Sequence, residues 1–175
     1  MMASLLTQTP TPMTETTKQV PSLYEWLGGA EVMTRLMVKF YERVSADELL
    51  RPLFGEMPVD HPQHVADFVG EVTGGPHDYT ATRGGHATML AHHFGKNISE
   101  AQRRRWVNLL LDSADEVGLP ADPEFRSALV AYLEWGSRLA VINSQLPPGT
   151  VADPATPMPK WGWGVPGGPY QPEKE

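Results

Sequence analysis

The chain has 175 residues, enough for one domain with a substantial core. Its 21 acidic residues outnumber its 14 basic ones, so the formal net charge of −7 argues against binding to nucleic acid or to an anionic membrane surface. The absence of cysteine excludes disulfides, thiolate catalysis and Cys-ligated zinc or iron–sulfur sites, so a metal would have to be held by His, carboxylate or Tyr.

Composition divides the chain into three parts. Residues 1–21 are rich in Thr, Gln and Pro without periodicity, which predicts a flexible N-terminal extension. Residues 22–146 are the expected folded domain. Residues 147–175 carry eight of the seventeen prolines, which excludes a helix there. This last part contains Trp161 and Trp163 in the stretch "KWGWG". These tryptophans dock on the domain or on a partner, or the segment is a disordered tail.

Helical periodicity and capping residues predict an all-α domain, because no segment alternates like a strand. The N-caps are expected at Ser22, Ser99 and Asp122. Pro52 is expected to break one short helix, and residues 76–85 are expected to form a loop. The predicted helices cover residues 22–29, 30–44, 46–54, 60–75, 86–94, 100–117 and 123–143.

No apolar run reaches the length of about 18 residues that suggests a membrane span. The N-terminus also lacks the basic and apolar pattern of a secretion signal. We therefore expect a cytoplasmic protein without membrane contact.

The histidines are confined to one part of the chain, with all six between residues 61 and 93. His77 and His86 lie beside glycines and are expected to be solvated or to cap a helix. His61 and His64 are three residues apart on one helix face, which by itself is a weak signal for a metal site.

The adjacent pair His92 and His93 falls at the end of a predicted helix. His93 shares one face with Met89 and Leu90, so it is expected to point inward, with His92 toward the edge. A buried histidine needs a partner for its ring nitrogens. Either a haem iron or a hydrogen bond in the core would supply that partner.

Several motifs occur in an order that resembles the truncated haemoglobins of group II, over residues 22–146. These motifs are "WLGG", "FY", "LLRPLF", "GGPHDYT", a "GH…L…H…I" stretch and "RRRW". The resemblance implies a two-over-two helical sandwich around haem b, an iron protoporphyrin. Counting back from Ile98 assigns the proximal iron ligand to His93.

The resemblance also implies a pocket around that ligand. Tyr41 and Trp106 would donate hydrogen bonds to bound O₂. His61 would lie at the distal position; alternatively, because Pro62 follows it, it caps the helix and points outward. Arg83 is an additional candidate where the propionates emerge. The other implied pocket residues are Phe40, Phe54, His64, Val65, Phe68, Tyr79, Met89, His92 and Phe94.

Two or three donors around one ligand would hold O₂ tightly. This suits redox chemistry, detoxification of NO or peroxide, or sensing better than bulk transport. No flavin or nicotinamide fingerprint is present, so such an activity would need an external reductase. The expected ligands are O₂ and other small diatomic molecules, bound by a monomer or homodimer.

Two other classes of protein remain open on the residues alone. A helical interaction module would use the Trp-containing tail to recruit partners. A non-haem metalloenzyme would hold iron or zinc through a subset of the following side chains: His61, His64, His92, His93, Asp60 and Asp67.

Overall fold

The computed structural model describes residues 20–164, and this part of the chain contains helices and no strand. The predicted all-α class is therefore confirmed. The helices are α1 (Leu23–Leu27), α2 (Gly29–Ala46), α3 (Arg51–Phe54), α4 (His61–Val72), α5 (Asp78–Arg83), α6 (Gly85–Ala91), α7 (Glu100–Glu116) and α8 (Pro123–Ser144).

Three helices begin at the residues that the capping pattern predicted. The Ser22 side chain accepts a hydrogen bond from the backbone N–H of Glu25, and the Glu25 carboxylate accepts one from the backbone N–H of Ser22, forming a capping box. A capping box at Ser99 starts α7 in the same way. Asp122 accepts from the backbone of Phe125 and starts α8. These bonds satisfy N–H groups that have no partner inside the helix.

Two local predictions are wrong. The expected loop over 76–85 contains α5, which is only six residues long and therefore too short to show helical periodicity in the sequence. Pro52 does not break a helix, because it lies in the first turn of α3, where a missing N–H costs nothing. Both errors concern very short helices.

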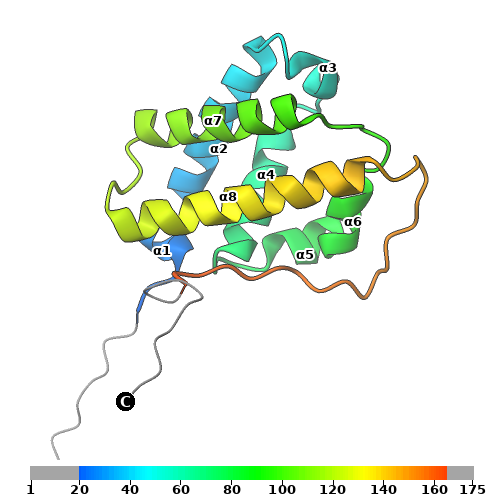
Figure 1. Cartoon of the computed structure of the whole chain (residues 1–175). Coiled ribbons are helices and arrows are strands. Elements are labelled where there is room, and N and C mark those ends of the chain that lie inside the picture. Colours follow the sequence, from blue (N-terminus) through cyan, green and yellow to red (C-terminus); the bar gives the residue numbers. More distant parts are fainter. Residues whose placement is uncertain (1–19, 165–175) are drawn as a thin grey trace, which may run out of the picture.

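Four of the helices form two packed pairs, α2 with α4 and α7 with α8, as in a two-over-two sandwich (Figure 1). Helix α2 packs on α4 and α7, and α7 packs on α8. Their apolar faces meet in one core, in which Phe40 and Phe125 are fully buried. Burial of this apolar surface is the main force that holds the pairs together.

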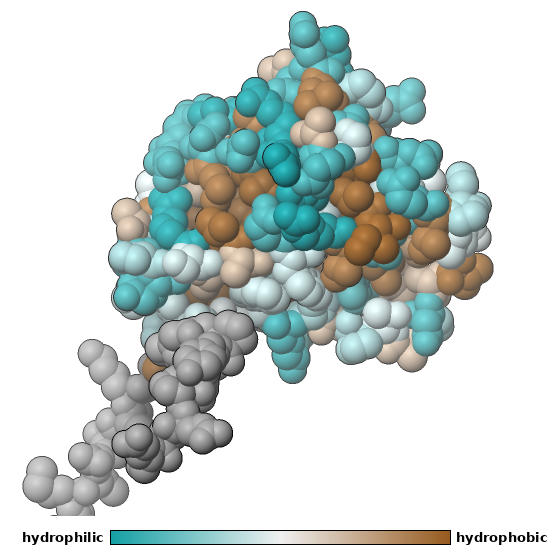
Figure 2. Space-filling model, in the orientation of Figure 1, coloured by the Kyte–Doolittle hydropathy of each residue, from teal (hydrophilic) through white to brown (hydrophobic). Residues whose placement is uncertain are grey.

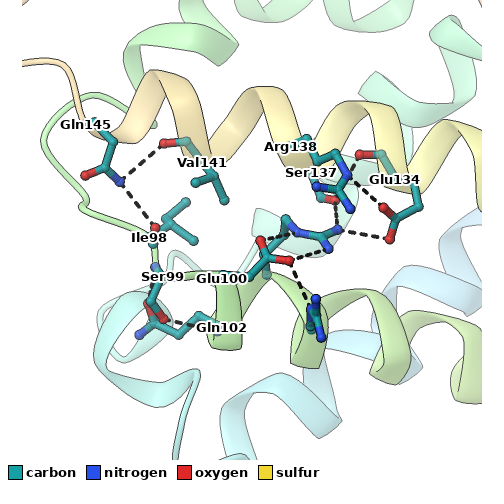
Figure 3. Close-up of polar contacts among 11 residues, drawn as sticks. Ile98, Ser99, Glu100, Gln102, Glu134, Ser137, Arg138, Val141 and Gln145 are labelled. Carbon is teal, nitrogen blue, oxygen red and sulfur yellow. Dashed lines mark hydrogen bonds and ion pairs between the residues drawn. The ribbon is translucent and has the colours of Figure 1, made fainter.

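A buried arginine of α7 joins this helix to α8, and Figure 3 labels three of its partners, Glu100, Glu134 and Ser137. Arg103 is only 4% exposed and binds Glu100 through two nitrogens, at 2.8 Å each. Its Nη1 also donates to Glu134 and to the Ser137 hydroxyl on α8, both at 3.0 Å. The planar guanidinium can satisfy all of these acceptors at once.

The segment after α8 packs back on the helices. Residues 147–164, drawn in orange to red, leave the end of α8 and return past α6 toward α1 (Figure 1). Trp161 and Trp163 lie half-buried against the core. Of the three options left open by the sequence, the structure therefore shows docking on the domain. The predicted N-terminal extension, apart from its last two residues, lies outside the described residues.

The surface on the α8 side is mixed. Figure 2 shows two hydrophobic areas on this face with a hydrophilic band between them. Within residues 20–164, none of the helices is long and apolar enough to cross a membrane. The large apolar side chains of α8 that are exposed are Val130, Trp135, Leu139 and Ile142.

Candidate functional site

An aromatic cluster joins α2 to α7. The rings of Phe40 and Trp106 meet edge to face at a centroid distance of 5.1 Å, and Phe40 contacts Tyr41 at 4.7 Å. Tyr41 is 3% exposed. Burial raises the pKa of Tyr41 far above its ordinary value, and a polar contact with Trp106 opposes only part of that rise. The phenol therefore stays protonated and can donate a hydrogen bond.

His61, the first residue of α4, lies against this cluster. Its ring meets Tyr41 edge to face at 4.8 Å and lies 6.1 Å from the ring of Phe54. Its Nε2 atom is buried and has no hydrogen-bond partner among the described residues. Of the two orientations left open by the sequence, the structure therefore shows the inward one.

The environment of His61 keeps its imidazole neutral. Burial lowers the pKa of His61 to about 4, and the neighbouring His64, His92 and His93 contribute to the decrease. At neutral pH the ring therefore carries one N–H and one free lone pair. It can donate or accept a hydrogen bond without the cost of burying a charge.

The pair at 92–93 lies in the turn that follows α6. His92 is exposed, whereas His93 is half-buried, as the helical phase predicted. His93 Nδ1 lies 2.9 Å from the carbonyl oxygen of Met89 and can only donate to it. Burial lowers the pKa of His93, so the ring is neutral at pH 7. The proton then resides on Nδ1, and the Nε2 lone pair is free for a metal.

Several apolar side chains near these histidines are only half-buried, in contrast to the packed core. Phe54 and Phe68 touch the core cluster from α3 and α4. An apolar surface of this kind gains further stability when an apolar partner covers it. The half-buried members are Phe54, Met57, Val65, Phe68, Met89, Leu90, Phe94 and Trp106.

Charged and polar groups surround the start of α4. His64 Nε2 lies 2.7 Å from Asp60, and Arg83 binds Asp67 at 3.3 Å. Tyr79 is instead buried against Phe68 at a centroid distance of 5.1 Å, and burial raises its pKa. Arg83 and His64 thus supply positive charge or N–H donors that an anionic group could recruit.

Comparison with known proteins identifies the family to which this arrangement belongs. Residues 22–135 match the model of the bacterial-like globins. The chain belongs to the bacterial-like globin family. Haem binding follows from this membership, and the two-over-two arrangement of the helices is the truncated form of the globin fold.

This globin is similar to characterised truncated haemoglobins. It is 32% identical over 117 residues to the group 2 truncated haemoglobin YjbI of Bacillus subtilis, which covers 67% of this chain and 86% of YjbI. The solved structure of a thermostable haemoglobin from Thermobifida fusca superposes with a TM-score of 0.61 at 33% identity, over 69% of this chain and 97% of that one. A truncated oxygen-avid haemoglobin from Bacillus subtilis superposes with a TM-score of 0.62 at 30% identity, over 69% and 99%.

The residues of this globin fit haem in two respects. The hydrogen bond from His93 to Met89 leaves one imidazole nitrogen with a free lone pair, which is the form that binds iron. The half-buried apolar side chains listed above would line a flat apolar macrocycle. In contrast, among residues 20–164 no three His, Asp or Glu side chains converge on one point, as a non-haem metalloenzyme would require.

The globin also contains polar contacts that the sequence did not suggest. Glu71 is buried in α4 and accepts hydrogen bonds from the Thr80 backbone at 2.9 Å, the Thr80 hydroxyl at 2.5 Å and His77 at 3.1 Å. His86, which was expected to be solvated or to cap a helix, does not cap α6 and lies 2.7 Å from the carbonyl oxygen of Pro157. In the sequence, only the acidic residue inside the apolar run "FVGEV" could have indicated the buried contacts of Glu71.

Proposed function

We propose that this globin binds haem b with His93 as the proximal iron ligand. The observation that supports this proposal is the hydrogen bond between His93 Nδ1 and the Met89 carbonyl, which leaves the Nε2 lone pair free to bind a metal. The neighbouring His92 is exposed and makes no such bond among the described contacts. When bound, haem would supply an iron that coordinates small diatomic gases.

Tyr41, Trp106 and His61 are the proposed hydrogen-bond donors to that gas. Tyr41 and Trp106 each present one polar atom on an otherwise apolar ring, and His61 presents an imidazole nitrogen. The edge-to-face contact between Tyr41 and His61 brings two of them together. The Nε2 atom of His61, which has no partner in the described part of the chain, supports an orientation toward a ligand. Phe40 contacts the rings of both Tyr41 and Trp106 edge to face, which limits their movement.

The remaining candidates would hold the macrocycle itself. His92, His64 and Arg83 carry N–H donors suited to the propionates, and Tyr79 would contribute chiefly through its buried ring. An apolar wall limits the access of water to the iron and slows its oxidation. The proposed wall residues are Phe54, Val65, Phe68, Met89 and Phe94.

The proposed activity is tight binding of O₂ and related diatomic ligands. Three donors around one small ligand slow its release, which suits NO or peroxide chemistry, or sensing, better than delivery. The similarity to the oxygen-avid haemoglobin of Bacillus subtilis, which is 30% identical to this chain, supports the proposal of tight O₂ binding. Electrons for such chemistry would come from an external reductase, since no nicotinamide or flavin fingerprint occurs in the chain.

Replacement of the two adjacent histidines tests the proposal. His93→Gly should lose the haem absorption band of the purified protein, and added imidazole should restore it by occupying the vacated space. His92→Gly is the matched control and should keep the wild-type spectrum. If His92→Gly abolishes haem binding while His93→Gly retains it, the assignment of the ligand is wrong.

A further inference from the structure

The Trp-containing segment 147–164, here called the strap, is anchored at its far end by its two tryptophans. Trp161 donates from its backbone to the Val72 carbonyl at 2.8 Å and from its indole to the Ala128 carbonyl at 3.0 Å. Its ring packs on Trp135 at 5.5 Å. The strap is therefore fixed to α4 and α8 at the same time.

Trp163 provides a second anchor, on the N-terminal side of the domain. Its indole donates to the Pro21 carbonyl at 2.7 Å, and its ring meets Trp26 edge to face at 5.5 Å. A tryptophan that is held by both packing and a hydrogen bond is a strong anchor, since each contact limits the freedom of the same ring.

Between α8 and these anchors, the chain contacts the α6 segment at both ends. Beyond the C-terminal end of α6, Gly95 donates to the Leu146 carbonyl at 2.8 Å, and Pro148 lies so close that a Cβ on Gly95 would be 2.5 Å from its Cγ. Near the N-terminal end, His86 Nδ1 lies 2.7 Å from the Pro157 carbonyl. His93 lies between these two fixed points.

Apart from the strap, helix α6 contacts α5, and the ring of His86 lies 6.2 Å from the ring of Phe68 on α4. Helix α6 is seven residues long, and Gly85 is its only fully buried residue. A helix of that length is not stable by itself in water, because its few hydrogen bonds do not offset the conformational entropy lost when the first turn forms. Its position must therefore come from contacts outside the helix, and the strap supplies one at each end.

We propose that the strap positions the α6 segment, so that His86 and Trp161 act through it to hold His93 in place for haem. The effect on haem rests on the proposed role of His93. The positioning of residues 85–97 does not, because it involves only contacts within the chain. The two parts can therefore be measured separately.

Hydrogen exchange on the haem-free full-length chain tests the positioning. Trp161→Ala removes the anchor, and Trp161→Phe removes only the indole donor. His86→Ala removes the bond to Pro157 together with the ring contact to Phe68, so the two Trp161 variants are the ones that act through the strap alone. Each of the three variants should raise amide exchange in residues 85–97 by about fivefold or more, the equivalent of one lost hydrogen bond. Exchange in α2 and α7 should stay at the wild-type level. Val151→Ala is the control, because Val151 lies on the strap and is 89% exposed.

The rate of haemin transfer from the loaded protein to an acceptor apoglobin tests the consequence. His86→Ala and Trp161→Phe should lose haemin several-fold faster than wild type and than Val151→Ala. Equal increases of exchange in all helices, or an increase confined to residues 147–164, would overturn the positioning role. Unchanged haemin loss with raised exchange would overturn the link to haem. If the wild-type chain does not take up haemin, the proposed function fails, while the exchange result still stands.

Discussion

The rings of Tyr41 and His61 meet edge to face, although Tyr41 lies in the C-terminal half of α2 and His61 begins α4. Burial keeps Tyr41 protonated and His61 neutral, and the buried Nε2 of His61 has no hydrogen-bond partner among residues 20–164. Together with Trp106, they concentrate three donors in a largely apolar environment. A hydrogen bond is stronger there than in water.

Removal of one donor should speed the release of O₂. A hydrogen bond to a partly charged acceptor contributes roughly 1.5–3 kcal/mol, and each 1.4 kcal/mol is about tenfold. Tyr41→Phe, Trp106→Phe and His61→Ala should each raise the O₂ dissociation rate, measured by stopped flow, by about ten- to a hundredfold. We expect an effect of the same size for His61→Ala because the His61 side chain points inward.

A matched control exists for the tyrosine. Tyr132→Phe removes the same hydroxyl from another buried tyrosine, on α8 beside Trp161, and should leave O₂ release unchanged. Because the donors share one acceptor, Tyr41→Phe combined with Trp106→Phe should differ from the product of the single effects. If only His61→Ala changes the rate, the proposed roles of Tyr41 and Trp106 are wrong.

Glu71 should make stability depend on acid pH. Burial alone would raise its pKa, but the hydrogen bonds from Thr80 and His77 outweigh burial and lower it below the ordinary 4.5. The unfolded chain therefore takes up the proton first, and the stabilisation present above pH 4.5 is lost as the pH falls through the lower folded pKa.

Urea unfolding of Glu71→Gln across pH checks this dependence. The variant should be less stable than wild type by about 1–3 kcal/mol at pH 7. That difference should shrink between about pH 5 and pH 3. The exposed Glu56→Gln should follow the wild type at every pH. A difference that stays constant down to pH 3 would show that the charge of Glu71 is not the cause.

Arg103 and Arg104 are adjacent, but their replacement by Lys should change the free energy of unfolding by different amounts. Both bind Glu100, but Arg103 is buried and also reaches Glu134 and Ser137, whereas Arg104 is exposed. Arg103→Lys should lower the free energy of unfolding by about 1–2 kcal/mol, because an ammonium cannot satisfy four acceptor atoms in this geometry. Arg104→Lys should stay within about 0.5 kcal/mol of wild type. Equal losses in urea unfolding would contradict this prediction.

Gly95 and Gly118 share a left-handed backbone with φ of +74° and differ in their surroundings. Gly118→Ala meets no atom within 4 Å, so it should cost only the backbone strain of about 1–2 kcal/mol. Gly95→Ala should cost about 1–3 kcal/mol more, because its Cβ would clash with Pro148. Thermal unfolding of both variants measures the difference. Equal costs would show that Pro148 moves freely away from Gly95.

The sequence by itself determined the features that depend on near neighbours in the chain. Ser22, Ser99 and Asp122 cap helices because each side chain bonds to a backbone N–H three residues later. His93 is inward because it lies four residues after Met89, and a bond between them keeps this relation even though α6 ends at Ala91. Such relations between residues three or four positions apart can be predicted from the sequence alone. The order of the motifs indicated the resemblance to the family.

Only the tertiary structure decided the orientation of His61 and the position of the strap. The sequence allowed His61 to face inward or outward, and its contact with Tyr41 on another helix selects the inward orientation. The indole of Trp161 meets a carbonyl that is 33 residues distant, and the indole of Trp163 meets one that is 142 residues distant. No local pattern encodes such partners, because they become neighbours only after the helices pack and bury their apolar faces.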